Sequence, residues 1–180
     1  PDGVHSAELT KLLRPFIYRR YIDFSAIESL RRMKQQIEQE NRRLNRRDNI
    51  KLGIGGIREV EFIVQTLQLI RGGRIPAMQQ PSLLKALQVM ADENILTAEQ
   101  VSELRQDYLL LRRIEQALQG IDDKQTQTLP QDDLSKAQLL ASVGFDNWQQ
   151  LQQQVDAAMA RVHQQFKLVI DNGEEPDQQE

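Results

Sequence analysis

KLGIGGIREVEFIVQ, residues 51–65, is the stretch that decides the fold of this 180-residue chain. Three of the four residues from Gly53 to Gly56 are glycine, and they interrupt any helix that arrives from the preceding residues. The sequence then stays strongly apolar up to Arg71, where two further glycines follow as a helix terminator. This pattern predicts a buried helix over residues 57–71, which we expect to be the hub of the fold.

Helical patterns also precede the glycine-rich stretch. Residues 6–20 carry an apolar stripe at three- and four-residue steps, and Pro15 among them predicts a kink or an early end. A capping-box sequence at residues 25–28 predicts the start of a longer helix, which we expect to end near Arg47. The stripe of the first helix consists of Leu9, Leu12, Leu13, Phe16 and Ile17.

Four more helices are predicted after the central one. Ser82 opens a helix that should stop near Asn94, and a capping box at residues 97–100 opens a long helix that should end before Gly120. A polar loop then separates two further helical patterns, over residues 134–143 and 148–170.

These segments together predict an all-α fold. We expect a helical bundle of about six to seven helices with no sheet. Residues 1–173 should form a single helical domain, and we expect a fragment of a longer protein, because the chain begins at Pro1 rather than at a methionine. Residues 174–180 should be a charged, frayed tail.

The composition excludes several classes of protein. The chain is 39% hydrophobic and 27% charged, which is typical of a globular domain, and it contains no cysteine. Disulfide frameworks, thiolate catalysis and cysteine-based zinc sites are therefore excluded. No apolar run approaches the roughly 20 residues that span a bilayer, so we expect a cytoplasmic protein without membrane contact.

The glycine-rich stretch has the outline of an anion-binding turn. Glycines allow backbone N–H groups to approach a ligand, and the following helix N-terminus is electropositive. Lys51, Gly53, Gly55 and Gly56 are accordingly the candidates for a position near a phosphate or nucleotide. The spacing matches neither the Rossmann nor the Walker pattern, and a tight turn that lets helices pack is an equal alternative.

Charged residues within the central helix are the second candidate feature. Arg58 and Glu61 are three residues apart and could pair, whereas Glu59 lies about 100° away from Arg58 and is the better candidate to reach a group outside the segment. Arg58, Glu59 and Glu61 are our candidates for active-site support. The chain offers no complete metal site, and the two histidines, His5 and His163, are not expected to form one.

A longer set of strings carries a resemblance to a known family. Besides the glycine-rich stretch, the strings are LRPFIYRRYIDF at residues 13–24, LIRGGR at residues 69–74 and QTQTLP at residues 125–130. Over roughly residues 10–170 the chain resembles the bacterial bifunctional glutamine synthetase adenylyltransferase/adenylyl-removing enzymes. It is most similar to the helical portion that follows the N-terminal, adenylyl-removing nucleotidyltransferase unit.

The resemblance implies a function for the parent enzyme. That family removes adenylyl groups from tyrosine on glutamine synthetase by phosphorolysis, which releases ADP, and its other unit adds them from ATP. It implies magnesium as the parent's cofactor, with none held by this chain, and glutamine synthetase and the PII signal protein as partners. The chain is then expected to pack on the nucleotidyltransferase domain and to complete its active-site cleft.

The family's Asp-x-Asp metal pair is absent from this sequence, so the isolated chain is expected to be inactive. The alternative is a stand-alone helical module that binds protein or nucleic acid through the arginines at residues 42–47. Nucleic acid is the less expected partner, because the acidic remainder offers no continuous basic face.

Overall fold

The computed structural model describes residues 2–18, 48–122 and 127–171, together with the pairs 28–29, 32–33, 35–36 and 39–40. Most of the helix predicted for residues 25–47, including its arginine cluster, lies outside the described residues, and so does the predicted tail at 174–180.

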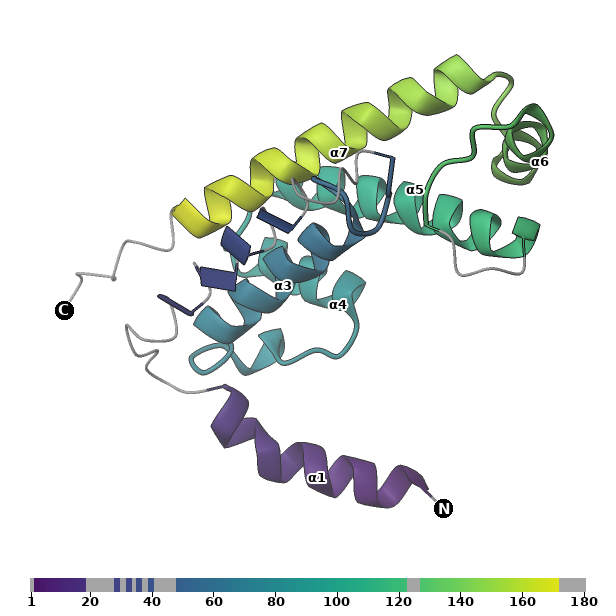
Figure 1. Ribbon diagram of the computed structural model, residues 1–180. Helices are drawn as coiled ribbons and strands as arrows, with labels where there is room; N and C mark the ends of the chain where they lie inside the picture. The colour runs from purple at the N-terminus through teal and green to yellow at the C-terminus, as the bar shows by residue number, and fades with distance from the viewer. Residues whose placement is uncertain are drawn as a thin grey trace.

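The described residues form an all-α structure, as predicted (Figure 1). Extended pairing among them is limited to one isolated bridge between Asn49 and Thr128. The elements in chain order are α1 (Asp2–Ile17), α3 (Ile57–Arg71), the 3-10 turn η1 (Pro76–Met78), α4 (Leu83–Asp92), α5 (Ala98–Asp122), α6 (Asp133–Val143) and α7 (Trp148–Asp171).

Side-chain caps form at the starts of α5 and α6, whereas Ser82 precedes α4 without a side-chain capping hydrogen bond. At the start of α5 the Gln100 backbone N–H donates to Thr97 Oγ1, and the Thr97 N–H donates to Gln100 Oε1, which completes the predicted capping box. Asp132 caps α6 by accepting a hydrogen bond from the Ser135 N–H. Gly144 ends α6 in the left-handed conformation.

The predicted end of α5 before Gly120 is wrong, because the helix continues to Asp122. A Cβ added at Gly120 would meet no atom within 4 Å, so this glycine lies in open space rather than in a turn. A glycine inside a helix costs only about 1 kcal/mol, and Ile121 packs against the core beyond it.

The hub role predicted for α3 is shared with α5, since α3 packs against α4, α5 and α7, whereas α5 packs against α3, α4, α6 and α7. Figure 1 shows α3 lying between the long helix α7 and the shorter helix α4. The core has two parts, one around Ile63 and Phe166 and the other around Ile57 and Leu151. Helices α3, α5 and α7 supply residues to both parts, so they hold the two halves of the bundle together.

Helix α1 lies apart from this core (Figure 1). Pro15 falls inside it, and the helix ends two residues later. The side chains of its predicted stripe are between 43% and 71% exposed, so the stripe forms as a helix face without being buried by the described residues. A contact with the bundle occurs at Tyr18, whose ring would be 2.6 Å from a Cβ placed on Gly72.

Among the described helices, none combines the length and the apolar character that crossing a membrane requires.

Candidate functional site

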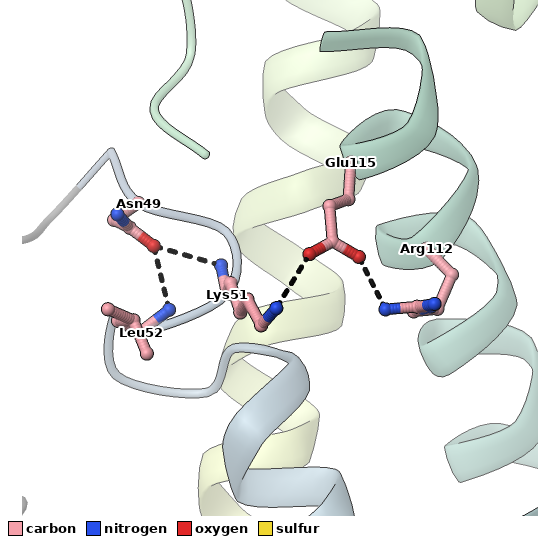
Figure 2. Close-up of polar contacts among 5 residues, drawn as sticks. All are labelled: Asn49, Lys51, Leu52, Arg112 and Glu115. Atoms are coloured by element: carbon pink, nitrogen blue, oxygen red, sulfur yellow. Dashed lines mark hydrogen bonds and ion pairs between the residues drawn. The ribbon is translucent and has the colours of Figure 1, made fainter. Parts of the chain in front are cut away.

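The glycine-rich stretch forms a compact loop organised by Asn49. The Asn49 side-chain oxygen accepts hydrogen bonds from the backbone N–H groups of Lys51, at 3.1 Å, and Leu52, at 2.7 Å (Figure 2). The Gly53 N–H donates to the Asn49 carbonyl at 2.8 Å, and the Gly56 N–H donates to the Gly53 carbonyl at 3.0 Å. A short polar side chain that bonds to nearby backbone groups is a common way to stabilise a tight turn.

The loop also closes on the start of α3. The Ile57 N–H donates to the Ile50 carbonyl at 3.0 Å, and the Arg58 N–H donates to the Lys51 carbonyl at 3.1 Å. A helix N-terminus binds anions through N–H groups that its own backbone leaves unpaired. Here the first of these groups bond to the chain's own carbonyls, so the backbone of α3 does not offer the open anion cradle that the sequence outlined.

Two of the glycines are explained by close packing. Gly55 has a φ of +77°, and a Cβ there would lie 1.8 Å from the carbonyl oxygen of Met159 on α7. A Cβ on Gly56 would lie 2.7 Å from the carbonyl oxygens of Ile50 and Lys51. Both positions exclude a side chain, which supports the alternative in which the glycines let the loop pack against α7.

A buried carboxylate lies next to this loop. Glu115 of α5 is 2% exposed and has two cationic neighbours (Figure 2). Arg112 Nη1 donates to its Oε2 at 2.6 Å, and Lys51 Nζ lies 3.2 Å from its Oε1. The Lys51 contact joins the glycine-rich loop to α5, and the charges compensate a carboxylate that would otherwise be costly to bury.

Glu59 points into the protein, between α3 and α7. Its side chain is 2% exposed, and its Oε2 lies 3.0 Å from Nδ1 of His163, which is at hydrogen-bond distance. Its Oε1 is buried and has no hydrogen-bond partner among the described residues. The group that Glu59 reaches outside its own segment is thus a histidine of this same chain.

The other two charged residues of the first turns of α3 are placed differently. Arg58 is exposed and Glu61 is half-buried. The pairing between Arg58 and Glu61 that their spacing allows does not occur: in the described part of the chain no ion pair joins them. Arg58 therefore presents its charge outward at the start of α3.

Sequence reasoning missed five residues of these buried networks. Asp107 of α5 is buried and pairs with Arg161 of α7, which donates from Nε to Asp107 Oδ2 at 3.0 Å and also from Nη2 to Oδ1. The other three are Glu115 with its partner Arg112, and His163. The sequence did hold a signal for these buried residues. Three of them lie three or four residues from apolar positions of their own helix, namely Asp107, Glu115 and His163. A polar residue within such an apolar stripe needs a buried partner.

The acidic and histidine side chains of the described ranges do not form a metal site. No group of three or more His, Asp or Glu side chains within the described ranges comes together in a way that could hold a metal ion. The three most deeply buried carboxylates, those of Glu59, Asp107 and Glu115, instead face His163, Arg161 and the Lys51–Arg112 pair respectively.

Comparisons with known proteins are consistent with the resemblance in the sequence. The family model described as GlnD PII-uridylyltransferase matches residues 31–170. The bifunctional glutamine synthetase adenylyltransferase/adenylyl-removing enzyme of Shewanella oneidensis is 55% identical over 175 residues, which are 97% of this chain and 18% of that enzyme. The enzyme of the same name from Shewanella loihica is 53% identical over 178 residues, 99% of this chain and 18% of that enzyme. The chain thus spans less than a fifth of the length of these relatives.

Proposed function

The chain belongs to the GlnD PII-uridylyltransferase family, and from that premise we propose that it is a helical, non-catalytic domain of an enzyme that adenylylates and deadenylylates glutamine synthetase. The observation that carries the proposal is the 55% identity over nearly the whole chain to one part of a bifunctional enzyme of this kind. Over that part, the sequence contains no Asp-x-Asp pair with which to hold catalytic metal ions.

The reaction belongs to the parent enzyme in this proposal. The parent would remove adenylyl groups by phosphorolysis, releasing ADP, and would add them from ATP in its other unit. Glutamine synthetase would be its substrate and the PII signal protein its regulator, in the cytoplasm. Magnesium would be bound outside this chain, since the three buried carboxylates are engaged with cationic or histidine partners and no group of three or more potential ligands comes together among the described residues.

The exposed face of α1 supports packing on a nucleotidyltransferase domain. Five large apolar side chains on one helix face, from Leu9 to Ile17, remain 43% to 71% exposed. Burying apolar surface stabilises by roughly 25 cal/mol per Å², so a contiguous face of this kind favours contact with another folded surface. In the proposed arrangement that surface is the nucleotidyltransferase domain, and the chain completes its active-site cleft.

The glycine-rich loop is the part that we place at the cleft. Its hydrogen bonds to Asn49, its contact with Met159 and the Lys51–Glu115 ion pair fix its shape. A loop fixed in this way can hold the exposed Arg58 in a defined place, where a guanidinium would steady a phosphate or a catalytic carboxylate. Glu59 would act indirectly in this scheme, by holding His163 and therefore α7 beneath the loop.

The test uses the full-length enzyme that contains this chain. Replacing Arg58 by Ala should lower the rate of deadenylylation at least about tenfold. This is the effect expected when one charge-assisted contact that stabilises the transition state is lost. Adenylylation, assigned to the other unit, should change much less. Arg105→Ala is the matched control, because Arg105 is also an exposed arginine, on α5. Deadenylylation at the normal rate in a folded Arg58→Ala enzyme would reduce the loop to a packing turn.

A further inference from the structure

The cluster around Glu115 has more positive charge than the buried carboxylate requires. One carboxylate, 2% exposed, is contacted by two cations, Lys51 from the loop and Arg112 from α5. Either cation alone would compensate the single negative charge. No second carboxylate of the described ranges pairs with either of them, so the cluster of three side chains has a net charge of plus one.

Both cations can be reached from solvent. The Lys51 side chain is 33% exposed and the Arg112 side chain 37% exposed, whereas the carboxylate between them is covered. Figure 2 shows Lys51 and Arg112 approaching the carboxylate of Glu115 from different elements, the loop and α5. The buried acid thus holds two exposed cationic groups close to each other.

Hydrogen-bond donors remain on both groups. A guanidinium has five N–H donors, and Arg112 uses one of them on Glu115. An ammonium has three donors, and Lys51 lies 3.2 Å from Glu115 Oε1 without satisfying that oxygen by a hydrogen bond. This one contact leaves at least two of the three Lys51 donors for a second acceptor.

A third cationic residue, Arg58, is attached to a neighbouring part of the backbone. The Arg58 backbone N–H donates to the Lys51 carbonyl, so the two residues leave the backbone from neighbouring points, and Arg58 is exposed. Arg58 thus carries a further positive charge on the first turn of α3, the helix that follows the loop of Lys51. The N-terminal end of α3 adds its positive dipole at the same place, even though its first N–H groups are bonded within the chain.

We propose that Lys51 and Arg112, held together by the buried Glu115 and joined by Arg58, form a binding site for a phosphate group. A phosphate carries about 1.5 to 2 negative charges at neutral pH and three acceptor oxygens, which suits cationic donors supplied from separate elements, the loop, α5 and the start of α3. A carboxylate, with one charge and two oxygens in one plane, would leave more of these donors without an acceptor. The contacts are made by side chains, in contrast to the backbone cradle that the glycines suggested.

This inference rests on the proposed function, in which Arg58 steadies a phosphate at this loop, but its test measures ligand binding by the chain and not deadenylylation by the enzyme, so the two can fail separately. The experiment is isothermal titration calorimetry on the 180-residue chain with inorganic phosphate, ADP and ATP in turn, without metal and at constant ionic strength. We expect saturable binding of phosphate or of a nucleotide. Equal affinity for all three ligands would assign the site to a lone phosphate, and tighter binding of ADP or ATP would assign it to a nucleotide's phosphate chain.

Variants then locate the site. Lys51→Gln and Arg112→Gln should each weaken binding about tenfold or more, and each leaves the other cation on Glu115 to keep the fold intact. Arg58→Gln should weaken binding without any change in stability, because it removes no ion pair among the described residues. Arg105→Gln, which removes the same charge from an exposed site elsewhere on α5, should bind normally. No saturable binding of any of the three ligands, or equal binding by all four variants, would overturn the proposal.

Discussion

Replacing Gly55 with alanine should destabilise the bundle severely, because two independent penalties meet at this position. Its φ of +77° lies in the left-handed region, which costs a residue with a Cβ roughly 1–2 kcal/mol. The added Cβ would also lie 1.8 Å from the carbonyl oxygen of Met159, and this oxygen belongs to the backbone of α7 and cannot rotate away.

The size of the effect follows from the movement required. An ordinary contact begins at 3.4 Å, so α7 or the loop must retreat by about 1.6 Å. Overpacking of a well-packed site costs about 1–3 kcal/mol, which brings the total to about 2–5 kcal/mol. For a domain of this length each kcal/mol shifts the melting temperature by roughly 2–4 °C, so we expect a decrease of about 4–20 °C.

The assay is thermal and urea unfolding of the 180-residue chain, followed by circular dichroism at the helix signal. Gly120→Ala is the matched control, because nothing lies within 4 Å of a Cβ at that position and the residue is inside α5. Alanine there should be neutral or stabilising by up to about 1 kcal/mol. If the melting temperature of the Gly55→Ala variant were within about 2 °C of that of the unchanged chain, the close contact between the loop and α7 would be contradicted.

Three further predictions concern the polar contacts. Glu59→Ala should lower the free energy of unfolding by about 1.5–3 kcal/mol in urea titrations, because it removes a buried partner of His163; an unchanged midpoint would contradict that contact. Arg161→Ala should destabilise more than Arg161→Lys in the same titrations, because it leaves the buried carboxylate of Asp107 without its donors, and the reverse order would be inconsistent with the pairing. The hydrogen bond from the Ser135 backbone lowers the pKa of the Asp132 carboxyl below 3.8. The capping hydrogen bond should therefore stabilise the fold above pH 3.8, and this stabilisation should be lost as the pH falls through the lowered pKa of Asp132. Asp132→Asn keeps a capping side chain that cannot titrate, and it should remove this part of the acid dependence measured by melting between pH 2 and pH 5.

The electrostatic contacts also show how α7 is held in place. Arg161 of α7 binds the buried Asp107 of α5, and this hydrogen bond raises the pKa of the Arg161 guanidinium. His163, two residues further along, contacts Glu59 of α3. One turn of α7 is thus fixed to two different helices, and Met159 just before it packs against the glycine-rich loop. A loop held by three elements is a suitable platform for the phosphate site and for the proposed cleft contact.

Helix positions were predictable because their signals are local. The extent of α3 over residues 57–71 follows from glycines on both sides of an apolar run, and the starts of α5 and α6 follow from side chains that cap the backbone within three residues. The end of α5 was not predictable in this way. A glycine reads as a stop signal in sequence, yet at Gly120 the surroundings are open and the packing of Ile121 continues the helix.

The candidate site was predictable only in part. The sequence indicated that the glycine-rich loop and the charges of α3 were unusual, and it identified the two alternatives of an anion site and a packing turn. It could not choose between them, because the deciding atoms, the Met159 carbonyl and the Glu115 carboxylate, lie 104 and 64 residues away from Gly55 and Lys51 along the chain. The tertiary contacts favour packing for the glycines and move the proposed anion contacts to side chains.

The sequence by itself therefore determined the all-α fold, most of the described helices and the family, since each depends on residues close together in the chain or on long identical strings. The tertiary structure decided which charged side chains are buried, which partners they have and which cations remain open to a ligand. The physical reason is that burial and pairing depend on how helices α3, α5 and α7 cross. Helical periodicity places Glu59, Asp107 and Glu115 toward the apolar side of their helices, but only the packed arrangement brings His163, Arg161, Lys51 and Arg112 to meet them.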